Sequence, residues 1–286
     1  MSQVIAGQFL NGIIVGTLYG IIALGVTMTF GITGIVNFAL GQFMMIGAYA
    51  VWHLTDVARL PFPVAAGLAI IIAALAGFLA DQTLFRFTRN NLVNGLLVSI
   101  GLISVIESAA IYFYTATPKN MDFVLSGSWS VGEITLSRMK VLSFGLLVAV
   151  VALTWAGLAR TWLGRATRAY AQNPEAAMLM GVRTSALQTG VVVYSCALAG
   201  FGGALYASLY SLEPSMGALF ILKGVEAAIL AGVGNLPGAL VGGIILGVTE
   251  SVGSLFLPVA FRDAYGLVFL VAILLFRPAG LFGGQK

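Results

Sequence analysis

The stretch VIAGQFLNGIIVGTLYGIIALGVTMTF, residues 4–30, contains no charged residue and decides the class of fold. A bilayer core about 30 Å thick is spanned by about 20 apolar residues in helical conformation, so this stretch is long enough to cross it. No Lys or Arg precedes Arg59, and the stretch therefore lacks the basic segment of a cleavable signal peptide. We expect it to remain in the mature protein as a first membrane helix.

The composition of the whole chain points the same way. Of its 286 residues, 59% are hydrophobic and 8% are charged, with a mean hydropathy of +1.02. Soluble domains devote roughly a quarter of their residues to charged side chains, so this composition excludes an ordinary soluble protein and a disordered one. The net charge is +4, but no run of Lys or Arg occurs, and nucleic acid is not an expected partner.

Further apolar runs follow the first one along the chain. They cover about residues 35–54, 64–80, 92–114, 141–158, 186–209, 224–233, 237–257 and 265–276. The run at 224–233 is too short to span a membrane alone. Glycines and prolines interrupt residues 32–41 and 217–238, which indicates broken or re-entrant helices. The sequence predicts an all-α polytopic membrane protein, a single domain over residues 1–286, with eight or nine transmembrane helices.

The basic residues suggest an orientation. Residues 160–183 carry four arginines against one glutamate, which is typical of a cytoplasmic loop. Arg86 and Arg89 fall on the same side, and so do Arg277 and Lys286 if the last three runs all cross. Arg262 and Asp263 then belong to an external loop. Residues 115–140 then form an external segment, expected to be a small ordered loop over the outer mouth.

Glycines recur at intervals of four residues at both ends of the chain. This spacing places them on one helix face, where small residues let two helix backbones approach closely. The expected packing residues are Gly12, Gly16, Gly20, Gly238, Gly242, Gly243 and Gly247.

Three carboxylates, Glu107, Glu226 and Glu250, lie inside apolar runs, where a charge costs a few kcal/mol. They either form structural pairs or a polar patch, for example Glu226 with Lys223 one helical turn away, or act as ion or proton relays. The uncharged polar residues of the same runs suit a pathway for a polar solute. These are Asn37, Gln42 and Asn94.

The loop at about residues 160–185 contains a short helix, expected at 174–180. Asn173 is suited to cap it, Pro174 to occupy its first position, Glu175 to face its positive end and Gly181 to end it. Seven residues are marginal as an isolated helix, so a partner protein or the membrane surface must hold it. Its expected contact residues are Ala176, Ala177, Met178 and Met180. The flanking Arg165, Arg168 and Arg183 are expected to meet carboxylates or lipid phosphates.

The segment RAYAQNPEAAMLMGV, residues 168–182, resembles the coupling-helix segment of permease subunits of branched-chain amino acid ABC importers, the LivH type. Other blocks agree and occur in the same order. They are NG at 11–12, YGIIALG at 19–25, VNFALGQFMMIGAY at 36–49, AGVGNLPGALVGG at 231–243 and RPAGLFG at 277–283. Leu40 departs from the family pattern, which often has histidine there. Relatives for urea, amides and other small organic solutes share this scaffold.

The resemblance implies a multi-pass permease of the bacterial inner membrane. It implies a second, homologous permease subunit, two ABC ATPase subunits that use ATP and Mg, and an extracytoplasmic solute-binding protein that delivers branched-chain amino acids or a related solute. No cofactor is expected in this chain, because no G-x-x-x-x-G-K-[ST] loop occurs and none of its lysines follows a glycine. The helix at 174–180 would then transmit ATPase closure to the membrane helices.

Other functions are less favoured by the sequence. An ion-coupled secondary transporter that uses the intramembrane glutamates is the alternative that stays open. An enzyme is not expected, because the chain has one His and one Cys, lacks H-E-x-x-H and G-x-S-x-G motifs, and offers no metal site. A channel is disfavoured since no ring of like charges or repeated filter motif is present.

Overall fold

The computed structural model describes residues 2–34, 37–88, 91–121, 127–131, 134–232, 234–256, 258 and 261–282, and within them it is almost entirely helical. Six helices of this described part are long and apolar enough to cross a membrane. They are α1 (Ser2–Met28), α3 (Phe62–Thr83), α4 (Leu92–Tyr114), α5 (Arg138–Arg160), α8 (Thr184–Ala207) and α10 (Leu236–Gly253). The helical membrane fold expected from the sequence is confirmed.

Shorter elements connect and complete this bundle. They are η1 (Thr29–Thr33), α2 (Leu40–Trp52), η2 (His53–Val57), η3 (Phe85–Phe87), α6 (Trp162–Gln172), α7 (Pro174–Leu179), α9 (Met216–Ala231), α11 (Arg262–Phe276) and the strands β1 (Ser128–Val131) and β2 (Ile134–Ser137). The strands pair antiparallel in a small hairpin within the segment that was expected to be an external loop, and no hairpin was expected there.

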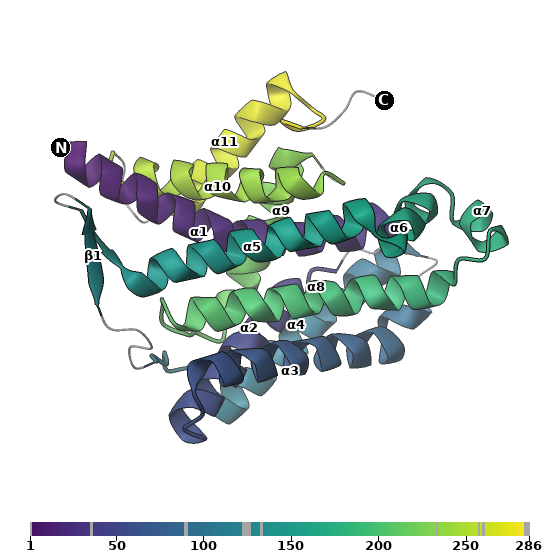
Figure 1. Ribbon diagram of the computed structural model, residues 1–286, viewed down its shortest axis with the longest axis horizontal. Coiled ribbons are helices and arrows are strands. Elements are labelled where there is room, and N and C mark those ends of the chain that lie inside the picture. Colours follow the sequence, from purple (N-terminus) through teal and green to yellow (C-terminus); the bar gives the residue numbers. More distant parts are fainter. Residues whose placement is uncertain are drawn as a thin grey trace.

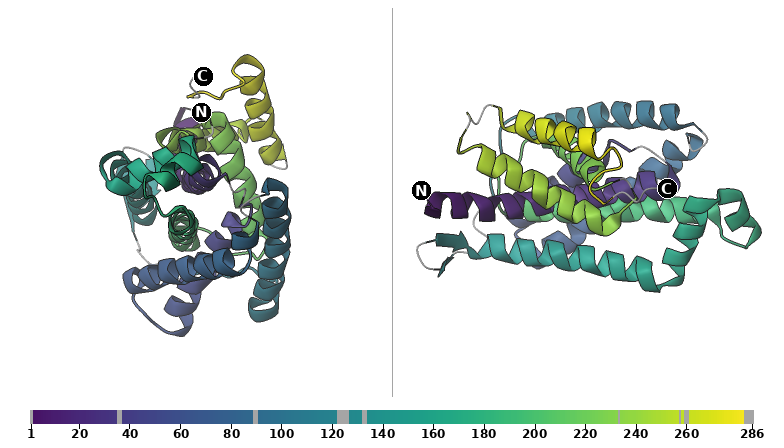
Figure 2. Two further views of the ribbon diagram at one scale, coloured as in Figure 1. Left: turned by 90° about the vertical axis from the view of Figure 1, so that its right-hand side faces the viewer. Right: turned by 90° about the horizontal axis from the view of Figure 1, so that it is seen from above.

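The long helices run roughly along one axis of the molecule (Figures 1 and 2). The β hairpin lies at one end of that axis, which we call the hairpin end. Helices α6 and α7 project at the opposite end, which we call the arm end (Figure 1). The two features therefore face opposite sides of a membrane crossed by these helices.

Helix α1 lies at the centre and packs along α10 through glycines. A Cβ added to Gly16 would lie 2.6 Å from the Gly243 carbonyl oxygen, so no larger side chain fits without separating the helices. The facing groups along the seam are Gly12 with Gly247 and Val248, Gly16 with Gly243 and Ile244, and Gly20 with Leu240. The four-residue spacing thus places three glycines of α1 against α10.

The other two glycines of the expected set have different neighbours. A Cβ on Gly242 would lie 2.4 Å from the Ala227 carbonyl oxygen, so Gly242 brings α10 close to α9. Gly238 stands against the side chain of Asn235, whose Oδ1 accepts a hydrogen bond from the Gly238 backbone N–H at 3.0 Å and caps α10.

A second close-packed region joins α2 and α3 to α8. A Cβ on Gly47 would lie 2.4 Å from the carbonyl oxygen of Gly200, and one on Gly77 would lie 2.6 Å from Cys196 Sγ. Cys196 is a free, fully buried thiol, as its apolar surroundings in the sequence indicated. Glycines therefore also bring α2 and α3 close to α8, in a region that the four-residue spacing did not reveal.

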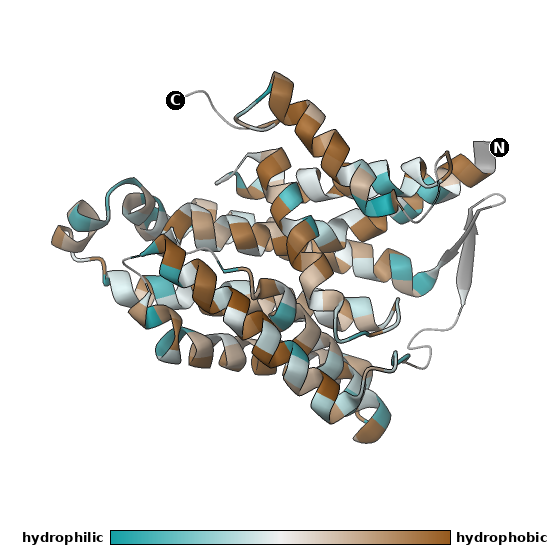
Figure 3. Ribbon diagram, turned by 180° about the vertical axis from the view of Figure 1, so that it is seen from behind, coloured by the Kyte–Doolittle hydropathy of each residue, from teal (hydrophilic) through white to brown (hydrophobic). Residues whose placement is uncertain are grey.

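The peripheral helices expose their apolar side chains. Most of the α4 surface is exposed, whereas most of α1 is buried. Brown, hydrophobic ribbon covers the middle of the outward-facing helices, and teal increases toward the two ends of the long axis (Figure 3). This distribution suits a bundle surrounded by lipid, where exposed Leu and Ile are stable.

Two expected boundaries were wrong. The short run at 224–233 is part of the continuous helix α9, which begins at Met216 and passes through Lys223. The charge of Lys223 interrupted the apolar pattern, but carboxylates of other helices neutralise it, so the helix continues. The expected interruption over 217–238 shrinks to a break between α9 and α10, where Gly232 and Gly234 have φ values of 95° and 96°.

The other predicted interruption, at residues 32–41, coincides with the junction between η1 and α2. Gly34 ends η1 with a φ of 69°, a left-handed conformation that glycine adopts without steric cost. Residues 35 and 36 lie outside the described part. Helix α2 then begins at Leu40, so the run expected from residue 35 is a helix of 13 residues.

Candidate functional site

The arm consists of α6 and α7, and it leaves the bundle through a sharp turn after α5. Thr161 begins α6 by accepting a hydrogen bond from the Gly164 N–H at 3.4 Å. A Cβ on Gly164 would overlap the Leu158 carbonyl group, so the close turn requires glycine there. The arm extends beyond the ends of the neighbouring long helices (Figure 2).

Helix α7 has the local structure that its sequence indicated. Asn173 Oδ1 accepts a hydrogen bond from the Ala176 N–H at 3.0 Å, and Pro174 occupies the first helical position. Gly181 adopts a φ of 87°, and the N–H groups of residues 181 and 182 bond back to carbonyls of residues 178 and 177. The helix ends at Leu179, one residue earlier than expected, and Met180 is its C-cap.

The outer surface of α7 is apolar and uncovered. Met178 is 58% exposed, and Leu179 and Met180 are each 86% exposed. Ala177 is buried against the chain, while Ala176 and Glu175 are exposed. Leu179 was not singled out in the sequence analysis, although it is among the most exposed apolar side chains of the arm. Apolar side chains gathered at the tip of a projecting segment are typical of a docking surface.

The cap of α7 gives a direct test of its local stability. Replacing Asn173 by Ala removes the acceptor for the Ala176 N–H, and we expect a loss of about 1 kcal/mol. Amide hydrogen exchange in residues 174–181 should then be about fivefold faster. Gln172→Ala, an exposed neighbour outside the cap, is the matched control and should leave that exchange unchanged. Equal rates in the two variants would contradict the assigned cap.

The three flanking arginines are exposed. Arg165 and Arg183 stand on either side of α7. Arg168 was expected to meet carboxylates or lipid phosphates, but its Nη1 donates a hydrogen bond to the Leu158 carbonyl oxygen at 2.7 Å. This bond ties the arm to the end of α5, so Arg168 contributes to the position of the arm.

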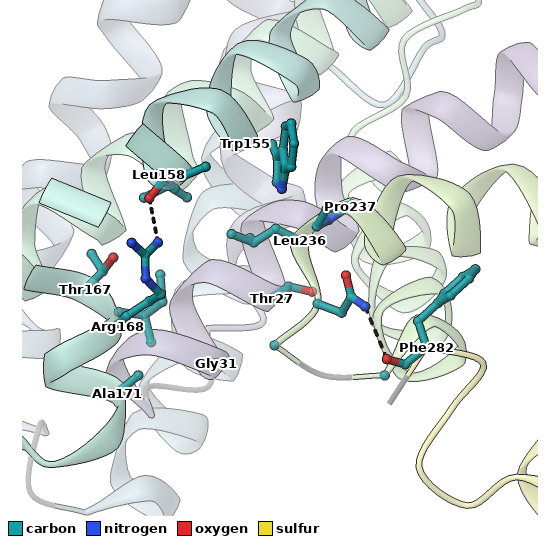
Figure 4. Close-up of a pocket in the computed structure, with 15 residues that line it drawn as sticks. Thr27, Gly31, Trp155, Leu158, Thr167, Arg168, Ala171, Leu236, Pro237 and Phe282 are labelled. Carbon is teal, nitrogen blue, oxygen red and sulfur yellow. Dashed lines mark hydrogen bonds between the residues drawn. The ribbon is translucent and has the colours of Figure 1, made fainter. Parts of the chain in front are cut away.

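A cavity of about 490 Å³ lies behind the arm (Figure 4). Arg168 and Thr167 of α6 form one wall, and Trp155 and Leu158 of α5 form another. Thr27 of α1 and Gly31 of η1 form the third. The opposite side contains Leu236, Pro237 and Phe282, and Asn235 Nδ2 donates to the Phe282 carbonyl oxygen at 3.2 Å. The arm, α1 and the start of α10 therefore meet around one space at the arm end.

Charged residues gather at a second place, between α9, α10 and α11. Lys223 Nζ lies 2.7 Å from Glu250 Oε1, 3.1 Å from Asp263 Oδ1 and 3.5 Å from Glu226 Oε2. Arg262 Nε lies 3.6 Å from Glu250 Oε2. We call these five residues the charge cluster. The expected pairing of Lys223 with Glu226 is present, but the shortest contact of Lys223 is with Glu250.

The remaining polar candidates lie apart from the charge cluster. Asn37 and Gln42 are buried near the start of α2, and the Gln42 amide adjoins Gly217 at the start of α9. Within the described residues, neither Oε1 nor Nε2 of Gln42 has a hydrogen-bond partner. Asn94 is exposed in the first turn of α4, and Glu107 is half-buried further along that helix.

Several polar contacts were missing from the sequence analysis. Arg262 and Asp263 were assigned to an external loop, although they complete the charge cluster. Asp81 was not recognised because it follows the apolar run at 64–80. Its carboxylate is fully buried and accepts a hydrogen bond from Thr189 Oγ1 of α8 at 2.6 Å.

Comparison with known proteins agrees over nearly the whole chain. A family model described as "Branched-chain amino acid transport system / permease component" matches residues 8–277. The chain is 31% identical to the high-affinity branched-chain amino acid transport system permease protein BraD of Pseudomonas aeruginosa, over 96% of this chain and 95% of the relative. It is 31% identical to the corresponding LivH protein of Escherichia coli K12, over 96% and 94%.

A probable branched-chain amino acid transport permease protein LivH from Methanocaldococcus jannaschii is 28% identical, over 96% of this chain and 91% of the relative. No solved structure matches the chain. The family match runs from within α1 through the arm and the charge cluster. With its apolar helical bundle, the chain therefore belongs to the family of permease components of branched-chain amino acid transport systems.

Proposed function

We propose that this chain forms the translocation pathway of an ATP-driven importer in the bacterial inner membrane, for branched-chain amino acids or a related small polar organic solute. The assembly contains a second, homologous permease subunit, two ABC ATPase subunits and an extracytoplasmic solute-binding protein. The family match and the substrate in the relatives' names support this assignment.

The observation that carries the coupling mechanism is the uncovered apolar tip of α7. Met178, Leu179 and Met180 extend from the arm, and a capped helix of this length is stabilised further when it docks on a partner. An ATPase subunit is the partner that fits, because this chain has no phosphate-binding loop of its own. ATP and Mg would be bound there, and the arm would transmit subunit closure into α5 and α8.

The arm end is the cytoplasmic side in this proposal, in agreement with the arginines around α7. The six long helices cross the membrane as one domain. The shorter helices α2, α9 and α11 enter it within the bundle, which brings the total to nine. The breaks before α2 and after α9 supply irregular backbone beside the pathway.

Polar side chains of the interior would line the pathway. Among the described residues, both polar atoms of the Gln42 amide and the Nδ2 of Asn37 lack a hydrogen-bond partner, although Asn37 Oδ1 accepts from the Ala39 N–H at 2.9 Å. Both side chains are suited to this role because a buried polar group without a partner costs about 1–3 kcal/mol, and a passing solute or water would relieve that cost. The cavity behind the arm provides an inner opening, since the arm itself forms one of its walls. Movement of α6 would then change access to the cytoplasm.

Reconstitution tests the proposed function. Proteoliposomes that contain this chain, its sister permease, both ATPases and external binding protein should accumulate labelled L-leucine only when ATP and Mg are present on the ATPase side. Omission of the ATPases should abolish uptake, and collapse of proton and sodium gradients should leave it unchanged. Uptake by this chain alone, driven by an ion gradient, would reject the proposal in favour of a secondary transporter that uses Glu226 or Glu250.

A further inference from the structure

A cavity of about 230 Å³, open on one side, adjoins the charge cluster. Its walls come from the middle of α1, the end of α8, the segment after α8, the middle of α9 and the start of α11. Binding sites for drug-sized molecules occupy about 300–1,000 Å³, so this space suits a solute somewhat smaller than those. It lies nearer the hairpin end than the cavity behind the arm, because α1 contributes Val15 and Leu18 here but Thr27 there, and α8 reaches it through Tyr206, at the end of that helix far from the arm.

The charged wall of this cavity contains Lys223, Arg262 and Asp263. Lys223 is nearly fully buried and already occupied by Glu250 at 2.7 Å. Arg262 is different, because its side chain is 36% exposed and its contact with Glu250 is made through Nε at 3.6 Å. Among the described residues, the terminal nitrogens of its guanidinium are the donors left for a ligand carboxylate.

Asp263 provides the opposite charge. Its Oδ1 lies 3.1 Å from Lys223 Nζ, yet its side chain is 73% exposed, so the second oxygen is accessible to a ligand. When all five side chains are ionised, the charge cluster holds three carboxylates and two cations. The excess negative charge favours a ligand that carries an ammonium group.

The other wall is apolar and aromatic. Val15, Leu18 and Leu219 line it together with Phe220, whose ring centroid is 5.8 Å from that of Tyr19 and 4.9 Å from that of Tyr206. Such a wall suits a branched aliphatic side chain. Tyr210 also lines the cavity, and its buried hydroxyl has no partner in the described part of the chain.

We propose that this cavity binds the zwitterionic form of an aliphatic α-amino acid during translocation. Arg262 binds the carboxylate, Asp263 accepts a hydrogen bond from the ammonium group, and Val15, Leu18 and Phe220 contact the side chain. This inference rests on the proposed function and adds to it a recognition site inside the permease. An uncharged solute such as urea would use neither Arg262 nor Asp263.

A purely structural role for the same residues predicts a different behaviour. The pairs Arg262–Glu250 and Lys223–Asp263 also fasten the start of α11 to α10 and α9. If fastening were their only role, the cavity would not distinguish ligands by charge. Ligand discrimination by the unaltered chain therefore separates the two roles without any mutation.

The experiment measures binding to the full chain in lipid nanodiscs by saturation-transfer NMR. The probes are L-leucine, 4-methylpentanoic acid, which lacks the ammonium group, and 3-methylbutylamine, which lacks the carboxylate. We expect leucine to bind at least about tenfold more tightly than either analogue, because each analogue leaves one charged group of the cavity unpaired. Equal affinities for the three compounds, or no binding of leucine, would overturn the proposal.

Variants then test which residue of the cavity binds the carboxylate of leucine and which binds its ammonium group. Arg262→Gln should weaken leucine binding by about tenfold and leave the affinity for 3-methylbutylamine unchanged, because that amine has no carboxylate. Asp263→Asn should also weaken leucine binding by about tenfold, but it should leave the affinity for 4-methylpentanoic acid unchanged, because that acid has no ammonium group. Arg277→Gln, which removes an exposed arginine after the other end of α11, is the control and should change neither affinity. Unchanged leucine affinity in both cavity variants would contradict the site.

Uptake by the reconstituted importer keeps the two proposals distinguishable. If the complete importer transports leucine but the cavity shows no preference for the zwitterion, the site is wrong and the permease function stands. If the complete importer shows no ATP-driven uptake of leucine or of other small polar solutes, the proposed function itself fails.

Discussion

ATP-driven uptake by the assembled importer is expected to fall at least about a hundredfold in the double variant Met178→Asp, Met180→Asp. Both side chains are exposed in the isolated chain, so the substitutions should not disturb its fold. On docking, each would instead place a carboxylate in an apolar contact, and central contact residues contribute about 2 kcal/mol or more each. Two such losses correspond to a factor of about a thousand in affinity for the ATPase, which makes a hundredfold effect conservative.

The matched control for this prediction is Met178→Leu, Met180→Leu. It preserves apolar character and approximate volume at both positions, and uptake should stay within about threefold of the unaltered chain. Co-purification of the ATPase with each variant shows whether the loss arises from docking. Normal uptake and ATPase association in the aspartate variant would show that the exposed tip of α7 is not the coupling surface.

The second large effect is expected at the seam between α1 and α10. Gly16→Leu should prevent close packing of these helices, because even a Cβ at that position would lie 2.6 Å from backbone atoms of Gly243 and Ile244. Overpacking typically lowers the free energy of unfolding by about 1–3 kcal/mol, and occasionally by more. The loss is expected to be at the upper end here, because separating the helices at Gly16 also loosens the neighbouring contacts of the seam. We expect the yield of monodisperse protein in detergent to fall several-fold and the midpoint of thermal unfolding to drop by several degrees.

Gly7→Leu serves as its control. Gly7 belongs to the same helix, but a Cβ there meets no heavy atom within 4 Å among the described residues. The two substitutions gain the same helix propensity and the same hydrophobicity, so a difference between them reports packing alone. Comparable yield and unfolding temperature in the two variants would contradict the glycine seam.

The sequence predicted the parts of this protein that depend on local patterns. The spacing of Gly12, Gly16 and Gly20 identified a packing face, because residues four apart lie on one side of a helix wherever that helix is located. Likewise, the capping role of Asn173 and the stop at Gly181 depend on a few neighbouring residues. Propensities of this kind need no knowledge of the tertiary structure.

The charge cluster could not be predicted in the same way. Glu226 and Lys223 are three residues apart, and their pairing was foreseen, but Glu250 and Asp263 belong to other helices. The start of α9 was placed wrongly for the same reason. A lysine in an apolar run indicates the end of that run unless carboxylates of other helices neutralise its charge, and such contacts are not visible in the sequence. Arg262 and Asp263 were assigned to an external loop for the same reason. Exposure likewise depends on the fold, and so Leu179 went unnoticed beside Met178 and Met180.

The seam between the first and the tenth helix also constrains how the protein is made. Helix α1 emerges from the ribosome first, whereas α10 begins at Leu236. At a synthesis rate of about 5–20 residues per second, roughly 10–40 s separate the two. During that interval the glycine face of α1 has no native packing partner, because α10 has not yet been synthesised. The membrane insertion machinery or a chaperone must therefore shield this face of the nascent helix.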